Sequence, residues 1–117
     1  MTDGSIVALD WPSDSDLRQV GTLVLGGVAA RTELSVDRVE ELGLAVDSLA
    51  RTIVDVRVQL EIDVTPEKLD VAIGPFRSDP LQDAGLARVV RTLVDEVEHR
   101  ERDGSSWVSL IVVLAQE

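Results

Sequence analysis

The segment VRVQLEIDVTPEKLDVAI (Val56–Ile73) decides the fold, because its residues alternate between apolar and polar. Every second residue of Val56–Val64 is apolar and those between are charged or polar, as in a strand with one buried face. Thr65–Lys68 holds a proline among polar residues and predicts a tight turn. Leu69–Ile73 then predicts an antiparallel partner strand, which we expect Gly74-Pro75 to end.

The chain before this hairpin predicts one strand and two helices. Ile6–Asp10 predicts a short strand that ends at Trp11-Pro12, and apolar residues at helical spacing predict a helix up to Arg31. Ser35 is the expected N-cap of a second helix. The apolar stripe of that helix is Val36, Val39, Leu42, Val46, Leu49, Ala50 and Ile53.

The chain after the hairpin predicts a loop over Phe76–Asp83, a third helix and two more strands. The helix gives way near Asp95 to a strand, and Arg102-Asp103-Gly104-Ser105 predicts a hairpin turn, since Asp-Gly suits positive φ values. Trp107–Leu114 is almost continuously apolar and predicts a central strand that is buried on both faces.

This order of elements predicts an α+β fold. We expect a two-layer sandwich, with a mixed, mostly antiparallel sheet covered on one face by three helices. The 117 residues suffice for a single domain over residues 1–117 with one core. Aromatic residues make up only 3%, so we expect an aliphatic core.

Composition excludes several classes of function. There is no cysteine and one histidine, His99, which excludes disulfides, a thiol nucleophile and multi-histidine or thiolate metal sites. The net charge of −11 argues against binding to nucleic acid or an anionic membrane, and it suits a basic protein partner. With no signal peptide at Met1–Ser5 and no apolar run long enough to span a bilayer, we expect a cytoplasmic protein.

Five segments, in this order, resemble the GHKL (Bergerat) ATP-binding fold. Within that fold, the chain is most similar to the anti-sigma factor kinases of bacterial stress and sporulation switches. The segments that carry the resemblance are Val20–Arg31, VEELGLAVDSLART (Val39–Thr52), LDVAIGPF (Leu69–Phe76), GLARVVRTLVDEV (Gly85–Val97) and DGSSWVSLIVVL (Asp103–Leu114).

The chain departs from that family at the positions of the residues that bind ATP and its magnesium ion. The resemblance puts Ser48 where the family has a catalytic Glu, and Thr52 where it has a magnesium-binding Asn. The adenine-binding Asp falls on Ala72, or on Ile73 with a one-residue slip, and neither side chain accepts a hydrogen bond. The loss of one charged acceptor in a buried site costs about 1.5–3 kcal/mol. The resemblance therefore implies a degenerate ATP site.

A remnant of that site would be lined by Gly74, Gly85, Ser48 and Thr52. Each residue also has a purely structural interpretation: a turn glycine, a helix-start glycine, and hydroxyls bonded to carbonyls of their own helix. We assign no catalytic residue and no metal ligand. No cofactor is expected, and ATP with magnesium enters only if the degenerate site still binds it.

Three single residues also have two interpretations. His99 lies in a charged run and fits a solvated edge strand better than a catalytic role. Trp11 and Trp107 fit either interface anchors or packing of the core.

The resemblance implies a regulatory protein of bacterial transcription or stress signalling, and the replaced ATP-site residues favour binding of a protein over enzymatic activity. It would bind a sigma factor or an anti-sigma antagonist, through a surface on the first helix near Arg18, Arg31 and Glu33, and a homodimer also fits the family. One alternative is an active ATP-dependent serine-protein kinase that acts on an anti-anti-sigma partner. The other is a structural remnant that binds only itself.

Overall fold

The computed structural model describes residues 5–12, 26–27, 34–52 and 57–114. The strands and the two described α-helices follow the order expected from the sequence, whereas a short 3-10 helix lies in the stretch predicted as a loop. The elements are β1 (Ser5–Pro12), α2 (Val36–Ala50), β2 (Arg57–Val64), β3 (Lys68–Phe76), the 3-10 helix η1 (Pro80–Gln82), α3 (Ala84–Leu93), β4 (Glu96–Arg102) and β5 (Ser105–Val113).

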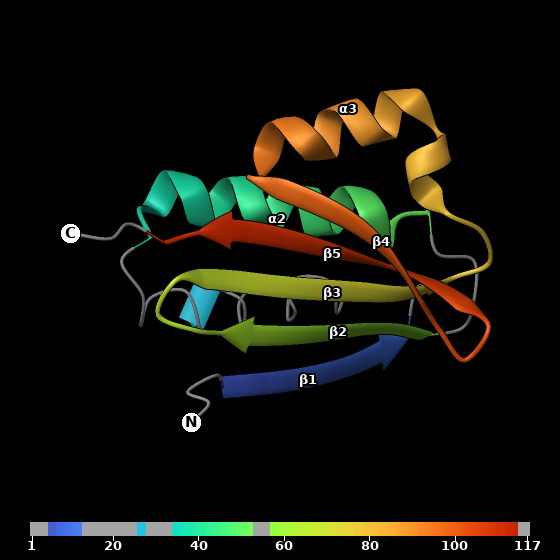
Figure 1. The fold of residues 1–117 in the computed structure, drawn as a ribbon, viewed down its shortest axis with the longest axis horizontal. Coiled ribbons are helices and arrows are strands. Elements are labelled where there is room, and N and C mark those ends of the chain that lie inside the picture. The colour runs from blue at the N-terminus through green and yellow to red at the C-terminus, as the bar shows by residue number, and fades with distance from the viewer. Residues whose placement is uncertain (1–4, 13–25, 28–33, 53–56, 115–117) are drawn as a thin grey trace.

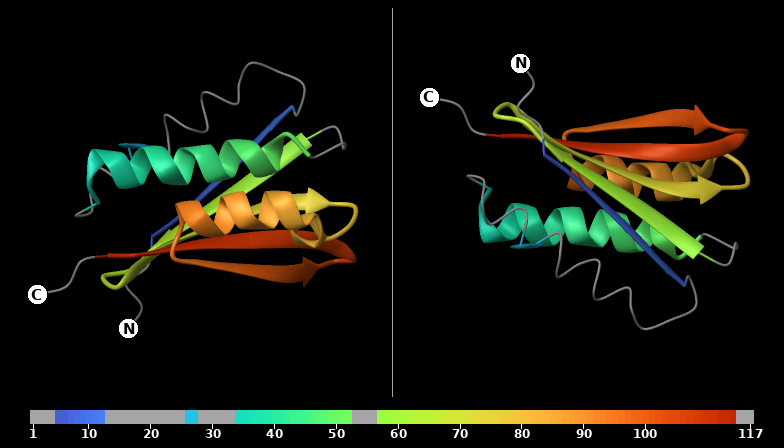
Figure 2. Two further views of the ribbon diagram at one scale, coloured as in Figure 1. Left: turned by 90° about the horizontal axis from the view of Figure 1, so that it is seen from above. Right: turned by 90° about the horizontal axis from the view of Figure 1, so that it is seen from below.

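The five strands form one sheet in the order β1-β2-β3-β5-β4. Helices α2 and α3 lie side by side on one face of this sheet (Figures 1 and 2). The α+β class and the two-layer arrangement are thereby confirmed. The mixed sheet is a wrong prediction for the described strands, because each of their four pairings is antiparallel.

The helix expected up to Arg31 lies outside the described residues, except that Gly26 and Gly27 are helical. The covering layer therefore consists of two helices in the described part of the chain. No helix in that part is both long enough and apolar enough to cross a membrane.

The core lies between the helices and the sheet and is aliphatic, as expected. Leu42 and Leu49 of α2 are completely buried against it. The sheet contributes Val58, Leu60, Ile62, Leu69, Val71, Ile73, Val108, Leu110 and Val112, each with no exposed surface. Val36 does not belong to the buried stripe, because it directly follows the N-cap of α2 and is 73% exposed.

The predicted cap and turns are confirmed by their hydrogen bonds and dihedral angles. The Ser35 hydroxyl accepts a hydrogen bond from the backbone N–H of Arg38 at 3.2 Å. The backbone N–H of Thr65 donates to the carbonyl of Lys68 at 2.9 Å and closes the β2–β3 turn. Asp103 and Gly104 have φ values of 51° and 82°, as a type I′ turn requires.

Two strands extend further than the sequence predicts. Strand β1 includes Trp11 and Pro12, because Pro12 lies on an edge strand, where a missing backbone N–H is tolerated. Strand β3 passes through Gly74 and Pro75, which are joined by a cis peptide bond, and its register with β5 shifts before Phe76. Gly74 has no side chain, so the ring of Trp107 packs directly on its backbone; a Cβ there would lie 2.6 Å from that ring.

On the face of the sheet opposite the helices, the side chain of Arg102 covers Trp107. The guanidinium of Arg102 lies 4.4 Å from the centroid of the Trp107 ring, and its Nη1 is 2.9 Å from Oε1 of Glu61 on β2. Trp107 is consequently only 5% exposed. This confirms the prediction that β5 is buried on both faces, and Trp107 is a packing residue.

Candidate functional site

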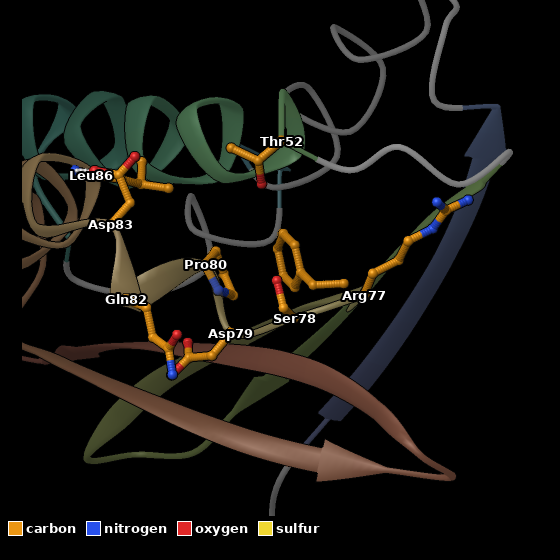
Figure 3. A pocket seen from close by; sticks show the side chains of 9 residues that line it. Thr52, Arg77, Ser78, Asp79, Pro80, Gln82, Asp83 and Leu86 are labelled. Atoms are coloured by element: carbon orange, nitrogen blue, oxygen red, sulfur yellow. Dashed lines mark hydrogen bonds between the residues drawn. The ribbon is translucent and has the colours of Figure 1, made fainter.

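A pocket of about 490 Å³ opens where α2 ends and the segment from β3 to α3 passes beneath it (Figure 3). This volume is within the range of small-molecule sites. The pocket is lined by Thr52, Phe76, Arg77, Ser78, Asp79, Pro80, Gln82, Asp83 and Leu86. It therefore lies between the last turn of α2 and the first turn of α3.

Two aspartates of this lining cap short helices. Asp79 precedes η1, and its Oδ1 accepts a hydrogen bond from the backbone N–H of Leu81 at 2.9 Å. Asp83 precedes α3, and its Oδ1 accepts from the N–H groups of Gly85 at 3.0 Å and Leu86 at 3.1 Å. Aspartate is among the preferred N-cap residues, because its carboxylate satisfies amides that have no partner within the helix.

The cap on α3 changes what the pocket can bind. The first amides of a helix attract anions and would be the natural donors for a phosphate group. Here the Asp83 carboxylate takes two of these amides and adds a negative charge at the same place. A phosphate group would have to displace Asp83 before it could use them.

Thr52 lines the pocket from the end of α2, but its hydroxyl hydrogen is already used. Its Oγ1 donates to the carbonyl of Leu49 at 2.8 Å. The bond to a carbonyl of its own helix that the structural interpretation expects is therefore present, while the oxygen can still accept a hydrogen bond from a ligand in the pocket.

The charges of the lining also disfavour polyphosphate. One arginine, Arg77, stands against two aspartates. The Arg77 side chain extends away from the other lining side chains rather than across the pocket (Figure 3). The described lining therefore lacks the excess of positive charge that phosphate recognition requires.

The other predicted site residues do not line this pocket. Ser48 is half-buried on α2, Gly74 lies within β3 against Trp107, and Gly85 is the second residue of α3. The two positions that the resemblance offered for the adenine-binding Asp are also buried: Ala72 is 6% exposed, and Ile73 belongs to the core. Of the four predicted residues, only Thr52 contributes to the pocket.

Sequence reasoning missed Asp79 and Asp83, the two acidic residues of the pocket lining. Both lie in the stretch that was predicted only as a loop. A usable signal was present, because Asp79-Pro80 and Asp83-Ala84-Gly85 each place an aspartate just before a helical turn.

Two further polar groupings lie outside the pocket. Nε2 of His99 is 3.0 Å from Oγ of Ser106, but His99 is exposed on edge strand β4, as expected, and a nucleophile also needs a substrate pocket and an oxyanion site. Among the described residues, no group of three or more His, Asp or Glu side chains could hold a metal ion.

The second grouping is a pair of carboxylates on the outer face of the sheet. Asp63 and Asp70 are directly opposite each other on β2 and β3, and Oδ1 of Asp63 is buried without a hydrogen-bond partner. Burial raises the pKa of the Asp70 carboxyl above its ordinary value, and Asp63 adds to the rise, while Arg100, Lys68 and Ser109 oppose it.

No protein-family model matches the chain, and no curated protein matches it in sequence. The resemblance to the anti-sigma factor kinases therefore stays a prediction from the residues.

Proposed function

We propose that the chain is a GHKL-like regulatory domain of the anti-sigma type that has lost its ATP chemistry and acts by binding a protein. Its partner would be a sigma factor or an anti-sigma antagonist in the bacterial cytoplasm. The order of the strands and of the two described helices supports the proposal, although the sheet is antiparallel throughout the described strands and not mixed as expected. The pocket supports it too, since it lies beside Thr52, the residue aligned with the magnesium-binding position.

The observation that best supports a loss of ATP chemistry is that Asp83 caps the N-terminus of α3. A pocket lies beside Thr52, but a carboxylate of the chain itself takes the helix amides on which phosphate binding would depend. Thr52 offers a neutral hydroxyl where an amide is expected, and its hydrogen is already donated to Leu49. Phosphoryl transfer depends on positioning the phosphates and their metal, so it suffers more than binding.

The surface that the resemblance offered, near Arg18, Arg31 and Glu33, lies outside the described residues. Within them, a candidate partner surface lies on the exposed side of α2. Leu44 is 57% exposed. Residues three and four positions away on a helix are its surface neighbours, and for Leu44 these include Glu40, Glu41 and Asp47. Glu41 and Asp47 are ion-paired with Arg38 and Arg51 of the same segment, so Leu44 is an apolar residue among mixed charges. The preference for a basic, partly apolar partner therefore rests on the net charge of −11.

The test is complex formation with the sigma factors and anti-sigma antagonists of the organism that encodes the chain. Size-exclusion chromatography with light scattering, without nucleotide, should show a complex with one of them. Leu44→Glu should weaken that complex at least tenfold. Val113→Glu, at a residue 54% exposed on the sheet, should leave it unchanged. If no candidate of either kind forms a complex, the proposal is wrong.

One observation favours the alternative of an active serine-protein kinase. The pocket has a volume of about 490 Å³, which is enough for a nucleotide-sized ligand. Transfer of labelled γ-phosphate from Mg-ATP to a serine of an anti-anti-sigma partner would establish the alternative, and Thr52→Ala should then reduce that transfer.

A further inference from the structure

Strand β4 forms one edge of the sheet and carries charges in an unusual order. Within the described part of the chain β5 is its only neighbour, and most of its residues are exposed. Its sequence is Glu96-Val97-Glu98-His99-Arg100-Glu101-Arg102. On the face away from the helices, two glutamates in the first half are therefore followed by two arginines in the second half.

This order of charges makes two copies of β4 complementary when they pair in one antiparallel register. If a second copy of β4 pairs antiparallel with His99 opposite His99, Glu98 of each strand is opposite Arg100 of the other, and Glu96 is opposite Arg102. A shift by two residues in either direction sets Arg100 against Arg100 or Glu98 against Glu98. Parallel pairing in register sets like charges against each other throughout. Like charges that are directly opposite destabilise a pair of strands.

The backbone N–H and C=O groups of β4 that face the open edge belong to the residues that this pairing requires. In a two-residue hairpin the closing residues, here Arg102 and Ser105, exchange backbone hydrogen bonds, and hydrogen-bonded residues alternate along the strand. The backbone groups of Val97, His99 and Glu101 therefore point to the open edge. In the symmetric pair they would form about six hydrogen bonds between the two chains.

The same alternation of backbone hydrogen bonds brings the Glu–Arg pairs of the two chains close together. Residues 98 and 100 of the two chains would form non-hydrogen-bonded pairs, in which opposite Cα atoms are about 4.5 Å apart and side chains are closest. Within one chain, Nη2 of Arg100 already lies 2.9 Å from Oε1 of Glu98. Two such ion pairs side by side would form a ring of four alternating charges.

We propose that the chain forms a two-fold symmetric homodimer through antiparallel pairing of β4 with β4, which joins two five-stranded sheets into one. Charges on an edge strand normally prevent such association. Here they select one partner, a second copy, and one register. This proposal is independent of the regulatory function proposed above, because it needs neither the pocket nor α2.

Variants with exchanged charges at positions 98 and 100 test the interface. Analytical ultracentrifugation over a range of concentrations, at about 0.15 M salt, measures their dimer dissociation constants. The unaltered chain should dimerise. Glu98→Arg alone and Arg100→Glu alone should each raise the dimer dissociation constant at least tenfold, since each sets like charges opposite each other at two places. The double variant E98R/R100E should restore dimerisation. An equimolar mixture of the two single variants should form a heterodimer.

Disulfide cross-linking tests the register. The chain has no cysteine, so His99→Cys introduces a single thiol. In the proposed dimer the two Cα atoms at position 99 are about 5.5 Å apart, within the range that a disulfide bridges. Mild oxidation should cross-link this variant quickly, whereas the control Glu67→Cys, in the exposed β2–β3 turn, should cross-link slowly.

Any of four results would overturn the proposal. One is an unaltered chain that stays monomeric at every concentration. Another is a dimer that neither single charge variant weakens, which would place its interface elsewhere. The third is equal cross-linking rates at positions 99 and 67. A charge-sensitive complex that β4 forms only with another protein would also contradict it.

Discussion

Gly74 shows how a single residue controls packing on the outer face of the sheet. From the sequence it resembled a turn glycine, but it lies within β3, where the missing side chain makes room for Trp107. The sequence shows that position 74 is a glycine, but it does not reveal the contact of Gly74 with Trp107. Trp107 is 33 residues away and is brought to Gly74 only by the pairing of β3 with β5.

Gly74→Ala should therefore destabilise the fold. The added Cβ would meet the Trp107 ring at 2.6 Å, and that ring is held beneath Arg102. Overpacking of this kind costs about 1–3 kcal/mol. Chemical denaturation measures the loss. The control is Gly85→Ala, whose Cβ would be 3.5 Å from Asp83 and which should be neutral or gain up to about 1 kcal/mol in helix α3. Equal effects of the two substitutions would contradict the proposed contact.

Asp70 makes the stability of the fold depend on pH. Its pKa is raised in the folded state, mainly by burial, so its contribution to stability is fully present below the unfolded pKa of about 3.8 and is lost as pH rises through the folded pKa. Asp70→Asn stays neutral at every pH. We expect this variant to melt at a higher temperature than the unaltered chain at pH 7, with the difference shrinking toward pH 4. A difference independent of pH would show that ionisation of Asp70 is not its cause.

Among the secondary-structure elements, η1 and α3 are each preceded by an N-cap aspartate that also lines the pocket. The period of the apolar residues predicted the helices, but the lining depends on where each helix begins. Helix boundaries are set by capping contacts that extend over only two or three residues. The pocket was therefore missed, except for Thr52, although both caps were present in the sequence.

Asp83→Ala should destabilise the chain by about 0.5–2 kcal/mol, because two amides of α3 lose their acceptor. Asp83→Ser, which keeps an N-cap oxygen without the charge, should restore most of the loss. Thermal and urea denaturation of the three proteins give the comparison. If both substitutions destabilise equally, the contribution of Asp83 comes from its charge rather than from capping.

At the scale of the whole molecule, alternation of residues in β2 and β3 and the Asp-Gly turn correctly predicted the central hairpin, the final hairpin and the two-layer fold. The extensions of β1 and β3 could not be predicted in this way, because Pro12 and Pro75 normally end strands. Pro12 is tolerated through its place at the edge of the sheet. The Gly74-Pro75 step is accommodated by a register shift against β5. Both depend on the arrangement of the complete sheet.

A titration of the unaltered chain with Mg-ATP, followed by its melting temperature, tests most directly whether the pocket has lost its ATP chemistry. A ligand present at a hundred times its dissociation constant stabilises a protein by about 2.7 kcal/mol, which is easily detected. Because Asp83 occupies the amides of α3 and the lining is acidic, we predict no change in melting temperature at millimolar Mg-ATP. A rise that yields a micromolar dissociation constant, and that Thr52→Ala abolishes, would contradict the central claim that this pocket has lost its ATP chemistry.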